Sequence, residues 1–276
     1  MNQVKSETGN LSINKNHLSL NTIVDLRLYP LDQAAFRVQC KNTFEKNDVL
    51  VLPGFLTSDA VNHIAIEGDT SQDKAYFTNS DHNIYLKPTD PEFAADHPRN
   101  RLVSSSKGCI TTDQIPDDSV LRTLYNNAAF KAFLCEILDE SALFDYADPL
   151  SSINLHYAAH GQELGWHFDN SSFAITLLIQ KPEAGGVFEY VKNVRDADRG
   201  EMSYTQAGEI LDGNAPVKTL SMDAGALVLF RGRNSLHRVT PTQGDITRML
   251  VVLAYNTELG IALSESARMT FYGRLG

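Results

Sequence analysis

The chain has 276 residues, of which 42% are hydrophobic and 9% aromatic, a composition typical of a globular protein with an adequate core. Its formal net charge of −10, with no block of five or more basic residues, argues against a nucleic-acid partner and favours a small-molecule ligand. No run of 18 apolar residues occurs, so we expect no transmembrane helix and no membrane partner.

A polar N-terminal stretch, residues 1–20, predicts a loose tail and lacks the apolar core of a secretory signal. The three cysteines, Cys40, Cys109 and Cys135, are far apart and form no CxxC pair, which is typical of a reduced compartment. These features predict a cytoplasmic protein, and they carry no prediction of its oligomeric state.

Helical patterns dominate the next part of the chain and predict a helical layer over residues 31–140. Its expected elements are a helix after a possible cap at Asp32, a short strand at 49–55, a helix at 57–68 capped by Thr57 or Ser58, and two helices at 119–140, the second capped by Asn127. Residues 69–118 interrupt this layer with a segment rich in Asp, Ser, Thr and Pro that still holds several aromatic residues. A linker is poorer in aromatics, so the segment predicts a long ordered excursion of functional importance.

After Pro149 the pattern changes to short strand-like runs separated by glycine and proline. Six such runs within residues 150–257 favour a sandwich or jelly roll. The predicted fold is therefore mainly β with flanking helices: a double-stranded β-helix (jelly roll, cupin-like) with an N-terminal helical buttress. With a C-terminal flap at 258–276, these parts are expected to form a single domain, residues 21–276.

A histidine and an aspartate stand two positions apart in the segment GWHFDNSSF, residues 165–173. Residues two apart in a strand point the same way, so His167 and Asp169 present an imidazole and a carboxylate on one face. The pair alone is a weak signal, but His237 follows 68 residues beyond Asp169 at the end of another strand-like run. Two histidines and one carboxylate on one face of an octahedron leave three positions open, as in non-haem Fe(II) oxygenases.

Arg248 follows His237 by eleven residues, in the strand-like run TRMLVVLAY. A dicarboxylate that chelates iron through one end needs its other carboxylate paired inside the barrel, and a guanidinium does this with a bidentate, charge-assisted bond. A buried arginine without such a partner is costly. Arg248 is therefore expected to hold the far end of 2-oxoglutarate.

The segment HFD at 167–169, with His237 and Arg248, resembles the HxD…H…R signature of Fe(II)/2-oxoglutarate-dependent dioxygenases. More narrowly, the chain over roughly residues 85–275 resembles the branch that contains free-amino-acid radical halogenases (BesD/HalD-like) and their hydroxylase relatives. The phrases that carry this resemblance are HPRNRLVSSSKG, DPLSSINLHY, ELGWHFDNSSFAITLLIQ, PEAGGVFEYV and LVLFRGRNSLHRVTP.

The resemblance implies that Fe(II) binds to His167, Asp169 and His237, with 2-oxoglutarate as cosubstrate and O2 as oxidant. It also implies that Tyr157, ten residues before the first ligand, donates a hydroxyl to the cosubstrate. Many relatives carry Ser or Thr two residues after the arginine, where this chain has Leu250; Thr176 and Thr240 are candidates for the missing hydroxyl.

Asp169 separates two outcomes within this branch. In the halogenases of the branch a small residue replaces the carboxylate and frees a coordination site for chloride. Because this chain keeps the aspartate, the resemblance implies hydroxylation of a free amino acid or a small amino-acid-like molecule, with release of succinate and CO2.

Strand alternation places Leu250, Val252 and Ala254 on the face of Arg248, which predicts an apolar pocket wall. Leu150 agrees with this preference if it faces the site. The remaining substrate candidates are Arg99 and Arg101 for a carboxylate, Asn170 for an amine, and Tyr272 as part of the closing flap. The alternative for the two arginines is an exposed basic pair, and the alternative for Tyr272 is ordinary packing. His156 and His160 are expected to be structural.

Three other functions stay open at this point. Desaturation or cyclisation uses the same residues as hydroxylation, and radical halogenation is disfavoured by Asp169. A non-catalytic cupin-like protein that keeps a metal for stability would leave Arg248 unexplained.

Overall fold

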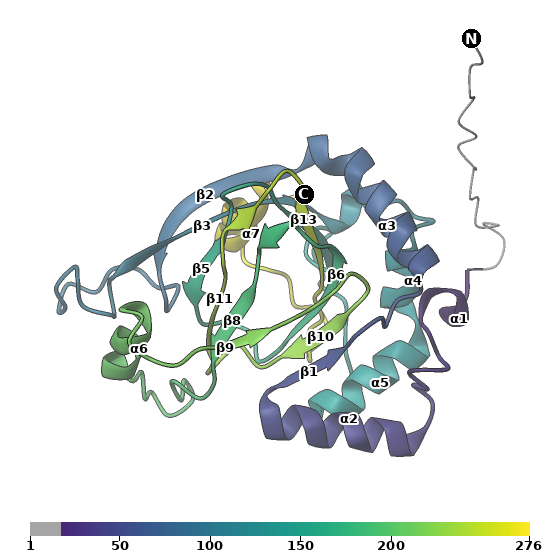
Figure 1. Cartoon of the computed structure of the whole chain (residues 1–276), viewed down its shortest axis with the longest axis horizontal. Helices are drawn as coiled ribbons and strands as arrows, with labels where there is room; N and C mark the ends of the chain where they lie inside the picture. Colours follow the sequence, from purple (N-terminus) through teal and green to yellow (C-terminus); the bar gives the residue numbers. More distant parts are fainter. Residues whose placement is uncertain (1–17) are drawn as a thin grey trace, which may run out of the picture.

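The computed structural model describes residues 18–276, which form a curled antiparallel sheet packed against helices (Figure 1). The sheet has eleven strands in the order β1-β10-β6-β13-β4-β3-β5-β11-β8-β9, with β2 attached to β3, and a second sheet pairs β12 with β7. The strands are β1 Val49–Leu52, β2 Tyr76–Asn83, β3 Leu102–Ile110, β4 Ile153–Ala158, β5 Leu164–His167, β6 Ala174–Gln180, β7 Ala184–Gly185, β8 Phe188–Val191, β9 Lys218–Leu220, β10 Leu227–Phe230, β11 Leu236–Val239, β12 Thr242–Gln243 and β13 Arg248–Leu253. Of the expected tail at 1–20, only residues 18–20 belong to the described part.

The sheet curls into two halves joined by β3. One half contains β1, β10, β6, β13 and β4, and the other contains β5, β11, β8 and β9. Strand β3 pairs with β4 through Gly108–Ile110 and with β5 through Ser105, so it links the halves. This arrangement agrees with the predicted mainly-β class with flanking helices.

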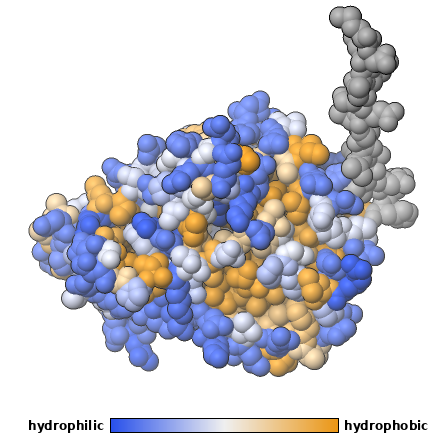
Figure 2. Space-filling view, in the orientation of Figure 1, coloured by the Kyte–Doolittle hydropathy of each residue, from blue (hydrophilic) through white to orange (hydrophobic). Residues whose placement is uncertain are grey.

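The helices gather mainly on one side of the sheet, where α2, α3, α4 and α5 cover its first half (Figure 1). The helices are α1 Leu20–Ile23, α2 Ala34–Asn47, α3 Ser58–Ser71, α4 Val120–Asn126, α5 Ala128–Leu138, α6 Tyr204–Leu211 and α7 Glu265–Tyr272, with short 3-10 turns at Gln72–Lys74 and Thr112–Gln114. Among residues 18–276, no helix combines the length and the apolar character needed to cross a bilayer. In the same view, hydrophobic side chains collect over the region of β10 and β1, and hydrophilic ones surround them (Figure 2).

Side-chain alternation divides the strands of the first half between two faces. In β4, Ile153, Leu155 and Tyr157 belong to the core shared with the helices. In β13, Met249, Val251 and Leu253 belong to the same core. The other face of these strands therefore points into the barrel, and it carries Asn154, His156 and Ala158 on β4 opposite Val252, Leu250 and Arg248 on β13. Burial of a large apolar side chain contributes about 1.5–3 kcal/mol, so a slip of one residue would be very unfavourable.

Two of the predicted helix caps are confirmed and one is wrong. Thr57 accepts a hydrogen bond from the Ala60 amide at 3.2 Å. Asn127 caps α5, since its Oδ1 accepts from the amides of Ala129 at 3.0 Å and Phe130 at 3.1 Å. The expected cap at Asp32 is wrong by one residue, because Gln33 is the last extended residue before α2 begins at Ala34.

Within the expected helical layer at 31–140, the strand predicted at 49–55 is confirmed as β1, but the layer also contains β2 and β3. The excursion at 69–118 is ordered, but it contains a long hairpin of β2 and β3 that the sequence pattern did not indicate. Strand β2 is exposed at most of its positions, so it lacks the apolar alternation that marks a half-buried strand. Helix α6 was likewise not expected.

The cap at Asn127 provides a test of the helical layer. Replacing Asn127 by Ala should lower the free energy of unfolding by about 1 kcal/mol, because two amides of α5 lose their acceptor. Asn127→Ser keeps an acceptor oxygen and should cost less. Urea unfolding measures both values, and equal losses in the two variants would contradict the capping role.

Candidate active site

Three side chains with metal-ligand chemistry meet where β5 and β11 pair. His237 on β11 lies directly opposite His167 on β5, and Asp169 follows two residues after His167. The Oδ1 atom of Asp169 lies 3.6 Å from Nε2 of His167 and 3.5 Å from Nε2 of His237. One ligand atom from each residue lies within 4.8 Å of the other two, so the structure brings the predicted triad together.

Backbone hydrogen bonds fix the orientation of both imidazoles. The Nδ1 atom of His167 donates to the carbonyl of Gly165 at 2.8 Å, and Nδ1 of His237 donates to the carbonyl of Ser235 at 2.9 Å. Because a carbonyl only accepts, each ring carries its proton on Nδ1 and turns a lone pair on Nε2 toward Asp169. This is the tautomer that a metal ligand requires.

The charge states also suit a cation. Burial, followed by the neighbouring His237, lowers the pKa of His167, so its imidazole is neutral at pH 7. Burial opposes ionisation of Asp169, but the two imidazoles outweigh it and hold the pKa of that carboxyl below its usual value. The site therefore presents a neutral imidazole of His167 and an ionised carboxylate of Asp169 beside the ring of His237.

A second observation points to a missing cation. The Oδ2 atom of Asp169 is buried and has no hydrogen-bond partner among the described residues. Burying an unpaired carboxylate oxygen is costly unless an ion neutralises it. Two imidazoles, one carboxylate and no thiolate match the ligand set of Fe(II), so the residues fit this ion.

Gly232 makes room for the carboxylate. A Cβ atom at this position would lie 1.8 Å from Oδ2 of Asp169, which is far inside van der Waals contact. The amide of Asp169 also donates to the carbonyl of Gly232 at 3.1 Å. The turn before β11 therefore holds Asp169 in place by close backbone approach.

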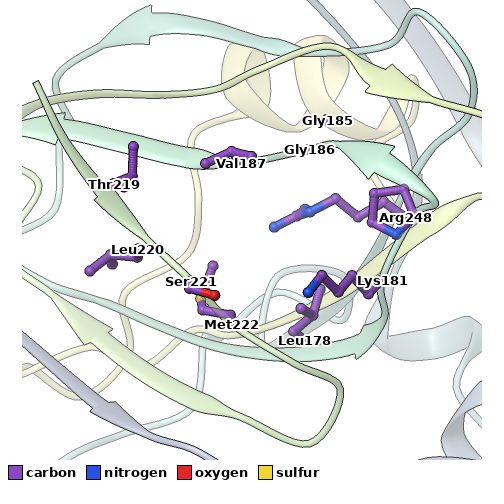
Figure 3. Close-up of a pocket in the computed structure, with 11 residues that line it drawn as sticks. Leu178, Lys181, Gly185, Gly186, Val187, Thr219, Leu220, Ser221, Met222 and Arg248 are labelled. Carbon is purple, nitrogen blue, oxygen red and sulfur yellow. The ribbon is translucent and has the colours of Figure 1, made fainter.

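Arg248 begins β13 and extends into a pocket between the two halves of the sheet (Figure 3). The pocket is lined by Leu178, by residues 181–182 and 185–187, and by Thr219–Met222. Burial lowers the pKa of Arg248 to about 10, so the guanidinium stays charged at pH 7. A Cβ atom at Gly186 would lie 2.9 Å from Cδ of Arg248, so this glycine lets the side chain pass.

The candidate threonines lie on either side of this region. Thr176 on β6 is half-buried and lies opposite Val252, one of the interior residues of β13. The Oγ1 atom of Thr240 accepts from the amide of Val187, a pocket residue, at 3.0 Å. Both threonines are near the arginine's strand or pocket, but Thr240 already has one hydrogen bond.

Tyr157 does not face the barrel, contrary to the expectation from the resemblance. Its side chain is fully buried in the core under the helices, and its hydroxyl donates to the carbonyl of Gly68 in α3 at 2.7 Å. The reason is alternation, since Tyr157 shares its face of β4 with Ile153 and Leu155. The interior positions of β4 are those on either side of it, His156 and Ala158.

Arg99 and Arg101 are used in the excursion rather than at the triad. Arg99 donates to the carbonyl of Pro88 at 3.1 Å and lies 3.9 Å from a carboxylate oxygen of Asp90. Arg101 forms an ion pair with Asp212 and donates to the carbonyl of Leu211, so it ties the excursion to α6 and the residue after it. These contacts leave Nη1 of Arg99 buried without a hydrogen-bond partner among the described residues, so the carboxylate clamp stays a prediction.

The other substrate candidates lie in different surroundings. Asn170 is exposed beside the triad, and its carbonyl accepts from Arg233 at 3.1 Å. Leu150 is fully buried in a cluster with Cys109 and Tyr272. Ala254 is half-buried just beyond β13, and its carbonyl accepts from the hydroxyl of Tyr125 at 2.8 Å.

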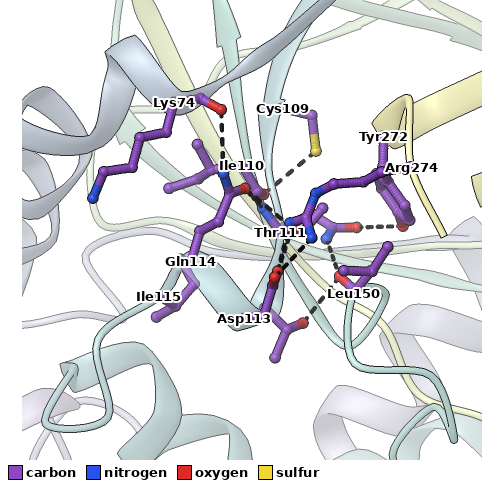
Figure 4. A network of polar contacts seen from close by, with 12 residues as sticks. Lys74, Cys109, Ile110, Thr111, Asp113, Gln114, Ile115, Leu150, Tyr272 and Arg274 are labelled. Atoms are coloured by element: carbon purple, nitrogen blue, oxygen red, sulfur yellow. Dashed lines mark hydrogen bonds and ion pairs between the residues drawn. The ribbon is translucent and has the colours of Figure 1, made fainter. Parts of the chain in front are cut away.

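Tyr272 ends α7 and closes one end of the interior face. Its hydroxyl donates to Oδ1 of Asn154 at 2.9 Å. Arg274 anchors this end of the chain, because it donates to both carboxylate oxygens of Asp113 at 2.7 and 2.8 Å and to Thr111 at 2.6 Å (Figure 4). A bidentate pair of this kind fixes geometry as well as charge.

Two residues inside the barrel, Lys107 and His156, were not predicted as site residues. The ammonium of Lys107 on β3 lies 3.3 Å from Nδ1 and 3.4 Å from Nε2 of His156 on β4. The alternation of INLHYA already separates His156 from the apolar residues of β4, and this was the signal that could have placed it in the barrel. Lys107 has no such signal, because β3 was not expected to be a strand.

Comparisons with known proteins agree with this geometry. Residues 32–269 match the profile of the family described as Halogenase D. Among solved structures, the chain is similar to the non-heme alpha ketoglutarate dependent epimerase SnoN from nogalamycin biosynthesis, at 14% identity, over 81% of this chain and 84% of that chain, with a TM-score of 0.57. It is also similar to the carbocyclase SnoK from the same pathway, at 11% identity, 79% and 82% coverage and a TM-score of 0.55.

A 2OG-Fe(II) oxygenase family protein from Burkholderia pseudomallei matches at 12% identity, over 82% of this chain and 92% of that chain, with a TM-score of 0.50. A search of curated proteins found no match. At these identities the solved structures speak for the fold alone, and they confirm the predicted double-stranded β-helix.

The space left by Gly232 gives a test of the triad. Gly232→Ala should weaken Fe(II) binding by about 10–100-fold, because the new methyl group displaces Asp169. The φ angle of Gly232 lies outside the range of +20° to +160°, so alanine adds no backbone strain there. Anaerobic calorimetry measures the affinity, with Asp169→Ala as the variant that lacks the ligand. Unchanged affinity in Gly232→Ala would contradict the assigned position of Asp169.

The orientation of Tyr157 gives a second test. Tyr157→Phe should lower the free energy of unfolding by about 1 kcal/mol, because the carbonyl of Gly68 loses its buried donor. The affinity for 2-oxoglutarate should stay within twofold of the original. Urea unfolding and anaerobic calorimetry measure the two quantities, and weaker cosubstrate binding at unchanged stability would restore the role expected from the resemblance.

Proposed function

The chain belongs to the halogenase D family, and from this membership we propose that it is an Fe(II)- and 2-oxoglutarate-dependent oxygenase that hydroxylates an amino acid. The reaction would insert oxygen into an unactivated C–H bond of a free amino acid or a small amino-acid-like molecule. The observation that carries the proposal is Asp169, whose Oδ1 lies within 3.6 Å of Nε2 of both His167 and His237.

The triad would hold Fe(II) through the two Nε2 atoms and the Asp169 carboxylate. When bound, iron and 2-oxoglutarate together supply the oxidising power, using O2 and releasing succinate and CO2. The role of the protein is to bind, orient and shield the reactants. The hydrogen bonds from Nδ1 of both histidines to backbone carbonyls support this role, because they fix the orientation of the ligand atoms.

Arg248 would bind the distal carboxylate of 2-oxoglutarate. No carboxylate of residues 18–276 lies within 4.0 Å of its guanidinium, although the group is buried and charged. An unpaired buried charge is costly, so the pocket favours an anionic ligand. The planar guanidinium also matches a carboxylate in a bidentate geometry.

Aromatic side chains would keep water away from the triad. The ring of Phe230 lies 4.9 Å from the ring of His237, and the ring of Phe188 lies 5.5 Å from it. Both phenylalanines belong to or pack on an apolar cluster inside the barrel. Exclusion of water strengthens the electrostatic interactions of the site and limits side reactions.

Hydroxylation is favoured over halogenation because the third protein ligand is present. A halide would need the coordination position that the Asp169 carboxylate would take in this chain. Desaturation and cyclisation use the same triad, so the residues do not separate them from hydroxylation. A metal-binding protein without activity would have no use for the unpaired Arg248.

The walls of the interior favour a substrate with an apolar or uncharged side chain. Leu250 and Val252 lie on the interior face of β13, and Leu150 is buried near Tyr272. We assign the amine of the substrate to the side of Asn170, which follows directly after the triad.

The product identifies the reaction. Protein supplied with Fe(II), 2-oxoglutarate and a pool of amino acids under air should release succinate and add one oxygen to one component, as detected by mass spectrometry. Asp169→Ala and omission of 2-oxoglutarate should each abolish the oxygen addition. A product that has lost two hydrogens would indicate desaturation, a chlorine isotope pattern would indicate halogenation, and the absence of any succinate would reject the enzyme.

A further inference from the structure

Lys107 projects from β3 toward the interior face of β4. Cys109 on β3 lies opposite His156 on β4, and Lys107 is two residues before Cys109, on the same side of the strand. Its ammonium lies 3.3 Å from the nearest ring nitrogen of His156 and 6.0 Å from the centre of the Phe271 ring in α7. Lys107 therefore stands between the barrel wall and the C-terminal flap.

The charge of Lys107 is not paired by the protein. No carboxylate in the part of the chain that the structure describes lies within 4.0 Å of its ammonium. The side chain is half-buried, and burial lowers the pKa of its ammonium. Burial, then Lys107 and Arg248, lowers the pKa of His156, so that ring is neutral and offers no negative charge. A position like this gains stability when an anion binds.

A count of charges indicates which anion is missing. The proposed cosubstrate carries two negative charges. A divalent ion with Asp169 has a net charge of +1, and Arg248 adds +1, so the cosubstrate is already balanced. No negative group of the cosubstrate then remains to pair with the ammonium of Lys107. Within the proposed function, the carboxylate of the substrate is the remaining negative group, while the substrate's own ammonium is assigned to the side of Asn170.

The position of Lys107 also differs from that of Arg248. The pocket of Arg248 is lined by Leu178 of β6, by residues between 181 and 187, and by residues 219–222, and it contains neither Lys107 nor His156. The pairing of Gly108 with Tyr157 puts Lys107 level with Ala158, and Arg248 lies opposite Ala158 on the other side of β4. Neighbouring strands are roughly 4.8 Å apart, so the backbones of β3 and β13 are separated by roughly 10 Å, which leaves room for two different carboxylates.

We propose that Lys107 and the neutral His156 form the binding position for the carboxylate of the substrate. This inference rests on the proposed function and is an alternative to the predicted clamp of Arg99 and Arg101. Lys107 donates an N–H of its ammonium to the carboxylate, and His156 donates its ring N–H, which gives two hydrogen bonds to one acceptor group. The apolar part of the substrate then lies beside Leu250, the residue opposite His156.

The flap completes this position. Tyr272 donates to Asn154, the interior residue two before His156, and Arg274 holds the flap on Asp113 (Figure 4). With the preceding Phe271 beside Lys107, α7 covers the end of the barrel where the carboxylate would bind. The flap therefore shields the ion pair from water and strengthens it.

The test uses binding rather than turnover. Anaerobic protein loaded with Fe(II) and 2-oxoglutarate is titrated with each of the twenty standard amino acids and with their carboxamides, and calorimetry measures the affinities. The original protein should bind at least one acid about tenfold or more tightly than its amide. Lys107→Met should weaken binding of that acid by about 10–100-fold, leave the amide nearly unchanged, and leave the affinity for 2-oxoglutarate unchanged.

Two further variants separate this role from a structural one. Lys87→Met, at an exposed lysine of the excursion, should change none of these affinities. Lys107→Arg keeps the positive charge and should retain part of the preference for the acid over the amide. The melting temperature of ligand-free Lys107→Met should be no lower than that of the original protein, because the change removes an unpaired, partly buried charge.

Several results would overturn the inference. These are equal binding of acid and amide by the original protein, no binding of any amino acid, an equal loss of amide binding in Lys107→Met, and weaker binding of 2-oxoglutarate in that variant. The proposed function fails separately, if no succinate forms with any amino acid, since the affinities in this experiment are measured without turnover.

Discussion

The antiparallel pairing of β5 with β11 is the constraint on which the site depends. It places His237 opposite His167, although the two residues are 70 positions apart in the sequence. The same end of the barrel receives Asp169, whose amide is bound to the carbonyl of Gly232. The ligand atoms are therefore positioned by backbone hydrogen bonds of a rigid sheet, which is the kind of support that a preorganised metal centre needs.

The interior of the barrel has an excess of positive charge that contrasts with the net charge of −10 of the whole chain. Asp169 is its acidic member, whereas Arg248 and Lys107 have no carboxylate partner in the described part of the chain. A cation at the triad increases this excess. The interior therefore stabilises acidic small molecules. The negative net charge of the whole chain disfavours their binding to the outer surface.

The sequence predicted which strands carry the site residues. It did not predict correctly, for every residue, on which face of a strand the side chain lies. The triad followed from the spacing of His167 and Asp169 and from the strand that ends at His237, and the fold class followed from the short runs after Pro149. The predicted contact of Tyr157 with the cosubstrate is wrong, because alternation along β4 turns this side chain toward the helices. The β2–β3 hairpin was missed because β2 is mostly exposed and carries no apolar pattern, and Lys107 on β3 was missed with it.

The two faces of β4 explain why its polar interior residues are not the one, Tyr157, that the resemblance indicated. Its outer face is closed by α3, since a Cβ atom at Gly68 would lie 2.8 Å from Leu155, and the hydroxyl of Tyr157 is used to hold that helix. Only Asn154, His156 and Ala158 are left for the interior. Their partners on β13 are apolar apart from Arg248, so one wall of the barrel offers hydrogen bonds while the next offers Leu250 and Val252. A ligand between these walls must be polar on one side and apolar on the other, and this asymmetry favours a carboxylic acid with a hydrocarbon side chain over a uniformly polar molecule.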